Sequence, residues 1–167
     1  MLPDSIRHLK GKELKNAIPD KIYISLKDMR ILTKVDMLML EMLANCNWER
    51  PLYMAISVGE VSKLKFDHYF VQEGLAFRFT PFDYKKWGNV KGDNNYAIDV
   101  ERLYENVMNR YKYGGLDTPG LYLDETTLRT CYYHRRLFAQ LAKELIRQGD
   151  NTRARKVLAL SLIHISE

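Results

Sequence analysis

The stretch Thr33–Val58, TKVDMLMLEMLANCNWERPLYMAISV, contains the signals that decide the fold. Thr33 can cap a helix, and Asp36 holds the position of the reciprocal carboxylate of a capping box. Apolar residues recur after it at steps of three and four, which predicts one face of a helix; they are Val35, Leu38, Met39, Met42 and Leu43. Met37 and Leu40 widen this face, so we expect the helix to be covered on more than one side.

A polar corner at residues 45–50 ends this helix, and Pro51 prevents it from resuming. The apolar run Leu52–Val58 has the length of a strand, and we expect it to be buried. An earlier run, Ile22–Leu26, is rich in β-branched and aromatic residues and predicts another strand. The order strand, helix, strand predicts two neighbouring parallel strands joined by a right-handed crossover.

Further elements follow along the chain. Phe66–Gly74 predicts a short helix that stops at Gly74, and Ala76–Thr80 alternates apolar with polar residues, as a third strand would. Asp83–Tyr96 is rich in Gly, Asn and Asp and predicts an exposed loop. The apolar spacing of Asp99–Tyr111 predicts a helix, closed by Gly114–Gly115. The predicted fold class is α/β, with a small core of about three strands and covering helices.

The C-terminal part predicts a helical hairpin. Asp124 caps a helix that ends near Gln148, and a second helix begins near Thr152. The inward positions are Phe138, Leu141, Ala142 and Leu145 on the first helix, and Ala154 and Leu158 on the second. Ala142 and Ala154 are small, and a bulky residue lies four positions before Ala142 and another four positions after Ala154. This layout resembles one tetratricopeptide repeat. A generic hairpin is the alternative. One repeat cannot bury its own apolar face, so it must dock on the core or on further repeats.

The charge pattern favours two interpretations. The formal net charge is +5, and eight Lys or Arg lie between Arg129 and Lys156 against Glu144 and Asp150. Such a surface can meet phosphates or acidic lipid headgroups, but a solvated helical face is the simpler interpretation. Tyr132–Tyr133 beside Arg135–Arg136 has the composition of a single-strand nucleic-acid binder. We expect these residues to divide between core and solvent, and we expect no nucleic-acid partner.

Signals for chemistry are few. The sequence has no nucleophile elbow, phosphate-binding loop or metal-ligand spacing, so we expect no catalytic residue, cofactor or metal in this chain. Cys46 and Cys131 allow one disulfide, but small buried hydrophobic residues are the simpler role. The best candidate for binding is the corner, whose members are Trp48, Glu49, Arg50 and Tyr53. Trp48 offers a stacking surface and the charged pair can orient polar groups; packing of the helix–strand junction is the favoured alternative.

Six segments carry a family resemblance: Ile18–Ile24, Leu40–Asn45, Asn47–Tyr53, Glu73–Arg78, Gly114–Asp117 and Tyr122–Glu125. Together they resemble the C-terminal soluble region of bacterial protein O-mannosyltransferase-like multi-pass membrane proteins, over about residues 6–159. The resemblance implies a parent whose membrane helices transfer sugar from a lipid-linked donor, using an acidic residue in an extracytoplasmic loop. This chain has no apolar run of the roughly 20 residues that span a bilayer, so no catalytic residue carries over.

The expected organisation follows from these observations. Residues 1–17 are a lead-in from a missing upstream region, 18–115 the α/β core, 116–159 the repeat-like hairpin, and 160–167 a tail that resembles a translated sequencing adapter. We expect a non-catalytic soluble accessory domain on the extracytoplasmic side of the inner membrane. Its expected partners are the membrane domain of the parent chain and acceptor proteins. The alternative is a free-standing helical-repeat interaction module.

Overall fold

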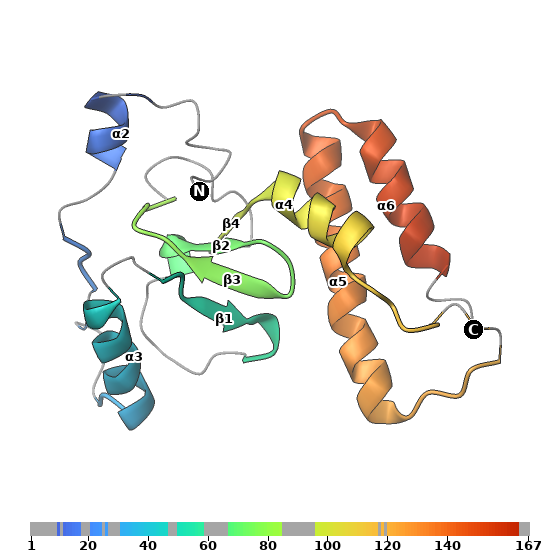
Figure 1. Cartoon of the computed structure of the whole chain (residues 1–167), viewed down its shortest axis with the longest axis horizontal. Helices are drawn as coiled ribbons and strands as arrows, with labels where there is room; N and C mark the ends of the chain where they lie inside the picture. The colour runs from blue at the N-terminus through green and yellow to red at the C-terminus, as the bar shows by residue number, and fades with distance from the viewer. Residues whose placement is uncertain are drawn as a thin grey trace. The chain divides into compact units, whose positions relative to one another are not determined.

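The computed structural model describes residues 10, 12–17, 21–24, 26, 31–46, 50–58, 67–84, 96–116, 118 and 120–163 (Figure 1). Contacts divide the chain into two compact units. The first comprises Met1–Gln72 with Ala76–Asp99, and the second comprises Glu73–Leu75 with Val100–Glu167. Strands lie in the first unit and a helical hairpin in the second, so the predicted α/β fold class is confirmed. The domain boundaries expected from the sequence stay predictions.

The first unit is built on a four-stranded sheet with the order β1-β3-β2-β4. Its strands are β1 (Tyr53–Ala55), β2 (Phe70–Gln72), β3 (Ala76–Phe79) and β4 (Ala97–Ile98). Strands β1 and β2 pair antiparallel with β3, and β4 pairs parallel with β2. The predicted parallel crossover pair is therefore wrong, because the strand that follows the helix pairs with an antiparallel hairpin strand instead.

The predicted strand Ile22–Leu26 is also wrong. Ile22, Tyr23, Ile24 and Leu26 are described and belong to no strand. Ile22 and Ile24 pack against the aromatic core of this unit, whereas the Tyr23 side chain is 80% exposed. Strand propensity measures how well a side chain packs on a half-buried surface. Here that packing is satisfied without backbone pairing.

Helix α3 (Lys34–Asn45) begins with the predicted capping box. Thr33 Oγ1 accepts a hydrogen bond from Asp36 N at 3.2 Å, and Asp36 Oδ2 accepts one from Thr33 N at 2.9 Å. The helix contributes Met39, Leu40 and Leu43 to the packing around the aromatic core. Four other apolar side chains of the helix are exposed; they are Val35, Met37, Leu38 and Met42. The expectation that α3 is covered on more than one side is wrong within the described part of the chain. A shorter helix, α2 (Lys12–Ala17), precedes it.

The aromatic core explains two further differences from the predicted elements. Tyr69, Phe70, Phe77 and Phe79 form the buried cluster, with Met54 and Ile56 packed against it. The predicted helix Phe66–Gly74 is instead a 3-10 turn, Asp67–Tyr69, followed by β2, because pairing on both sides buries this segment. The predicted strand Leu52–Val58 ends at Ala55 and continues as a 3-10 helix, Ile56–Val58. It is an edge strand, and Tyr53 and Ala55 are exposed rather than buried.

Part of the predicted loop Asp83–Tyr96 lies outside the described residues, namely 85–95. Its beginning is not exposed, because Tyr84 is buried and Tyr84 N donates to the backbone oxygen of His68 at 3.0 Å. The neighbouring Phe82 is also buried. Tyr96 packs edge-on against Phe77. The described ends of the segment thus belong to the core of the first unit.

The second unit contains the predicted helices. Helix α4 (Val100–Glu105) continues as a π-helix, Asn106–Arg110; α5 spans Glu125–Arg147 and α6 spans Asn151–Ile163. Asp124 caps α5 by accepting a hydrogen bond from Thr127 N at 3.1 Å. Ala142, Ala154 and Phe138 are buried as predicted. Leu158 is 43% exposed, and Val157 is the buried bulky residue of α6. Of the two residues predicted to face inward on α6, Ala154 is confirmed and Leu158 is wrong, because its neighbour Val157 takes the buried position.

Candidate functional site

The predicted binding corner is only partly described. Trp48 and Glu49 lie outside the described residues. Arg50 is exposed in a bend, and Tyr53, the first residue of β1, is 53% exposed. Arg50 and Tyr53 are therefore accessible to solvent, as a contact surface requires. Whether Trp48 and Glu49 join them stays a prediction.

Strand register places Tyr53 beside a residue that the sequence did not single out. Phe79 N donates to Leu52 O at 2.9 Å, and Tyr53 lies opposite Arg78. Since hydrogen-bonded and non-hydrogen-bonded pairs alternate in an antiparallel ladder, Tyr53 and Arg78 form a non-hydrogen-bonded pair, in which side chains approach more closely. The candidate site therefore contains a phenol next to a guanidinium at the edge of the sheet.

Arg78 lies among small apolar residues on one face of the sheet. Side chains alternate between the two faces of a sheet, so Arg78 and Tyr53 point away from the aromatic core. They share their face with small apolar residues at the paired positions; these are Ala55, Val71, Ala76 and Ala97. Arg78 is half-buried, and its Nε and one terminal nitrogen are shielded from solvent. A guanidinium in this setting is held by packing rather than free to sample many rotamers.

This face can offer hydrogen bonds at its exposed margin, because Tyr53 is 53% exposed whereas Val71 and Ala97 are buried. A guanidinium and a phenol can donate hydrogen bonds to carbonyl, carboxylate or hydroxyl oxygens. Within the described residues, no group of three His, Cys, Asp or Glu could hold a metal ion. Cys46 and Cys131 are both free and half-buried. The site thus has directional hydrogen-bond donors and an aromatic ring.

A second polar cluster holds the turn between β2 and β3 within the second unit. Glu73 is buried and pairs with Arg102 Nη1 at 2.8 Å. Asn106 Nδ2 donates to Glu73 O at 2.6 Å, and Tyr111 Oη accepts from Leu75 N at 2.9 Å. The π-helix supplies Asn106 and ends directly before Tyr111. Local sequence patterns gave no signal for this cluster, because its members lie about 30 residues apart in the chain.

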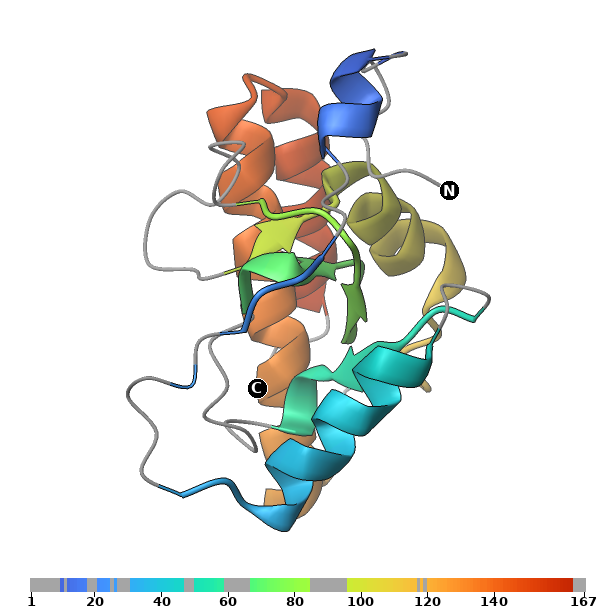
Figure 2. The ribbon, with the colours of Figure 1, turned by 90° about the vertical axis from the view of Figure 1, so that its left-hand side faces the viewer.

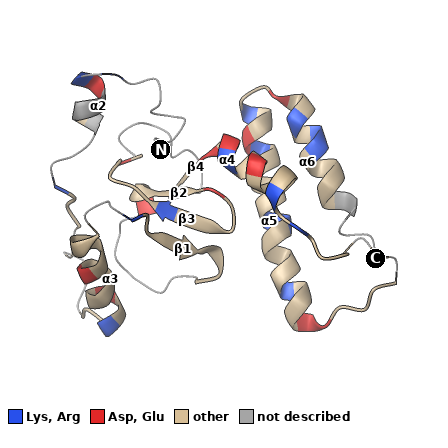
Figure 3. Cartoon of the chain, viewed as in Figure 1, with Lys and Arg blue, Asp and Glu red and all other residues tan. Residues whose placement is uncertain are grey.

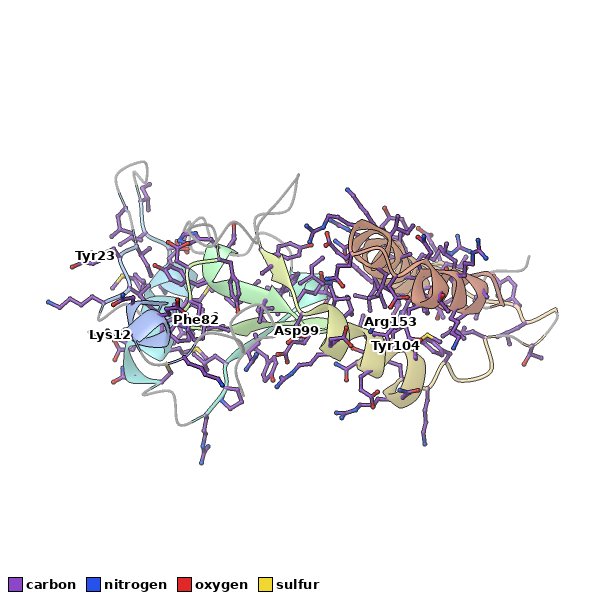
Figure 4. The ribbon with its side chains drawn as sticks, turned by 90° about the horizontal axis from the view of Figure 1, so that it is seen from above. Lys12, Tyr23, Phe82, Asp99, Tyr104 and Arg153 are labelled. Carbon is purple, nitrogen blue, oxygen red and sulfur yellow. The ribbon has the colours of Figure 1, made fainter. Side chains whose placement is uncertain are left out.

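A third cluster joins α4 to α6 through Arg153 (Figure 4). Its guanidinium binds Glu101 Oε2 at 2.7 Å and Asp150 Oδ2 at 2.6 Å, and lies 5.2 Å from the centre of the Tyr104 ring. Hydrogen bonds to Glu101 and Asp150 raise the pKa of Arg153, and hydrogen bonds from Arg153 lower the pKa of Asp150. Because the Arg153 guanidinium is bound by two carboxylates, one of them on α4, this cluster links α6 to α4.

The basic segment of α5 divides between the interior and solvent, as expected, although Tyr133 is its one inward member among these four residues. Tyr133 is half-buried, but Tyr132, Arg135 and Arg136 are all exposed. Tyr132 therefore shares the solvent side of α5 with both arginines, whereas only Tyr133 turns toward the interior. Nearby, burial raises the pKa of Tyr113 to about 12, with a smaller contribution from Tyr111. The Tyr113 hydroxyl donates to Val107 O at 2.8 Å.

Comparisons with known proteins gave one result. The model of a family described as TMEM260-associated domain 2 matches residues 5–101. This family is linked to TMEM260, a protein O-mannosyltransferase-like protein. No curated protein and no solved structure matches the chain significantly. None of the helices in the described ranges combines the length and the apolar character needed to cross a bilayer.

Proposed function

Because this chain belongs to the TMEM260-associated domain 2 family, we propose that it is a non-catalytic accessory domain of a TMEM260-like protein. In this proposal the parent protein transfers the sugar, and this domain binds the protein that receives it. The domain works on the extracytoplasmic side of the membrane, beside the membrane domain of its parent. The family match is the single observation that carries the proposal, and the surface of the first unit supports it.

The exposed face of α3 is the surface best suited to a protein partner. Val35, Leu38 and Met42 follow at helical spacing and are 41%, 63% and 52% exposed, respectively. Large apolar side chains gathered on one exposed face are typical of protein interaction sites. Methionine side chains also adapt to different partner shapes, which suits a domain that receives more than one acceptor sequence.

The edge of the sheet adds a polar part to this surface. Helix α3 and strand β1 both contribute side chains to the packing around the aromatic core, and their ribbons are neighbours in Figures 1 and 2. Strand β1 is at one end of the strand order, so an extended acceptor segment can add beside it. Tyr53, which is 53% exposed, then lies at the border of that segment, and its hydroxyl group can donate a hydrogen bond to a carbonyl oxygen.

The test uses a full-length membrane protein that carries this domain. The triple variant Val35→Ser, Leu38→Ser, Met42→Ser removes the apolar face of α3 without touching the aromatic core. We expect the KM for the acceptor protein to rise roughly ten-fold, which corresponds to about 1.4 kcal/mol of lost binding. Sugar transfer is measured in isolated membranes, at matched protein amounts.

A matched control removes two exposed apolar side chains from the second unit. Ile146 and Leu158 are 53% and 43% exposed, and their replacement by Ser should leave the KM unchanged. Deletion of the whole domain gives the decisive outcome. Unchanged transfer and unchanged acceptor choice after that deletion would refute the proposal.

The alternative of a free-standing interaction module has its own support in the helical hairpin, where Ala142 is buried and α5 is in contact with α6. The gene sequence upstream of Met1 separates the two functions. An open reading frame with several apolar segments of about 20 residues supports the accessory domain. A stop codon followed by a ribosome-binding site supports the free-standing module.

A further inference from the structure

Tyr132 lies at the centre of an exposed cluster on α5. Its neighbours three and four positions away on the helix are Leu128, Arg129, Arg135 and Arg136, and residues at these spacings share one surface. Leu128 and Tyr132 are 51% and 62% exposed. All three arginines are exposed as well. We call these five residues the Tyr132 patch, and we propose that it binds the headgroups of an anionic phospholipid bilayer.

The arginines of the patch are available to bind phosphate. Arg135 and Arg136 form no ion pair with any residue in the described ranges. Arg129 meets Glu125 at 3.5 Å, with both side chains largely exposed, so water weakens that pair. Each planar guanidinium can donate two parallel hydrogen bonds to phosphate oxygens. The patch therefore presents three cations that few local carboxylates neutralise.

The apolar members suit the boundary between headgroups and acyl chains. The chain enters α5 through Leu121 and Tyr122, which are 47% and 89% exposed. With Leu128 and Tyr132 they give the beginning of α5 two aliphatic and two aromatic side chains in contact with solvent. Tyr and Trp concentrate at the membrane–water interface, where the ring meets apolar chains and the hydroxyl meets water. Basic side chains beside such residues are the signature of surface-bound helices.

The distribution of charge points the same way. Residues 124–163 carry eight Lys or Arg against four Asp or Glu, while the whole chain has a net charge of +5. The hairpin thus accounts for most of the excess positive charge. Figure 3 shows the basic residues spread along α5 and α6, with few acidic residues between them. An anionic bilayer attracts a polybasic surface over about one Debye length.

Nucleic acid fits the patch less well. Single-strand binders stack successive bases on several aromatic side chains, but Tyr133 is half-buried and Tyr132 is the one aromatic member of the patch. Leu128 and Leu121 offer no ring for stacking. The inference also rests on the proposed function in one respect, because a domain attached to a membrane protein works within reach of a bilayer.

The experiment measures co-sedimentation of the full chain with vesicles made of equal parts phosphatidylglycerol and phosphatidylcholine. We expect binding at low salt, no binding to pure phosphatidylcholine, and loss of binding at about 0.5 M salt. The variant Arg129→Gln, Arg135→Gln, Arg136→Gln should bind roughly a hundred-fold more weakly, because each basic residue near the surface contributes about five-fold. Circular dichroism should show the same thermal unfolding for the variant and the wild type.

A charge-matched control separates the patch from the net charge. Lys10, Lys12 and Lys34 are exposed and lie in the first unit, and their replacement by Gln removes the same charge. This control should lose less than about five-fold. Equal losses in both triple variants would overturn the inference, as would absence of binding at low salt or tighter binding to a single-stranded oligonucleotide than to the vesicles. None of these results depends on sugar transfer, so they are distinct from a failure of the proposed function.

Discussion

At the scale of single residues, Gly74 has the least room for a side chain among the glycines that the structure describes. A Cβ atom there would overlap the hydroxyl group of Tyr111, which accepts the hydrogen bond from Leu75 N. We expect Gly74→Ala to lower the free energy of unfolding by about 1–3 kcal/mol, as overpacking of a tight site does. Urea unfolding followed by circular dichroism measures the change.

The cause of this loss can be isolated with Tyr111→Phe. The phenylalanine lacks the hydroxyl group that a Cβ at Gly74 would meet. Gly74→Ala should therefore cost less in the Tyr111→Phe background than in the wild type, and the difference is the coupling free energy of the pair. The same cost in both backgrounds would show that the backbone of the turn, rather than the overlap, causes the loss.

At the scale of elements, the packing of α5 against α6 depends on small buried residues. Ala154 is 2% exposed, so Ala154→Leu inserts three carbon atoms where no space exists. We expect a loss of about 1–3 kcal/mol in the free energy of unfolding. Ala159→Leu is the matched control, because Ala159 is exposed on the same helix. It should change stability by less than about 0.5 kcal/mol. Equal losses would mean that α6 does not pack through Ala154.

Elements with local signals could be predicted from the sequence. The capping box of Thr33 and Asp36 and the Asp124 cap of α5 involve residues three positions apart, so their hydrogen bonds follow from the order of residues alone. Strands depend on distant partners. The segment Phe70–Gln72 is a strand because β3 and β4 pair with it on both sides, and no local pattern contains that information. The same reason explains the missed strand β4, which has two residues.

The candidate site could likewise be predicted from the sequence only in part. The sequence singled out Arg50 and Tyr53, which the structure describes as exposed. Its missed member, Arg78, lies opposite Tyr53 only through the register of β1 and β3. One residue of slip would turn Arg78 toward the aromatic core, since successive side chains point to opposite faces. The strand register therefore determines which residues lie beside Tyr53. That register is set by the pairing of the whole sheet, which the local sequence around residues 45–50 does not contain.

At the scale of the whole molecule, backbone amides should be protected from hydrogen exchange to different degrees. The degree depends on how completely each helix or strand is buried. Thr80, Tyr84 and Asp99 are buried and donate backbone hydrogen bonds within the first unit, so their amides should exchange slowest there. In the second unit, Leu141 and Leu145 should exchange slowest, because both are fully buried on a helix that contacts α4 and α6. Hydrogen exchange followed by nuclear magnetic resonance gives these rates residue by residue.

Helix α3 provides the contrast within the same molecule. Only one side of it packs on the aromatic core, and elements with few buried contacts open at low free energy. Its amides should therefore exchange roughly a hundred-fold faster than those of Thr80 and Asp99, which corresponds to a difference of about 2.7 kcal/mol in opening free energy. Addition of an acceptor protein should slow exchange in α3 and leave Leu141 and Leu145 unchanged. Slow exchange in α3 of the isolated chain would show that its apolar face is already covered, and the acceptor surface would then have to lie elsewhere.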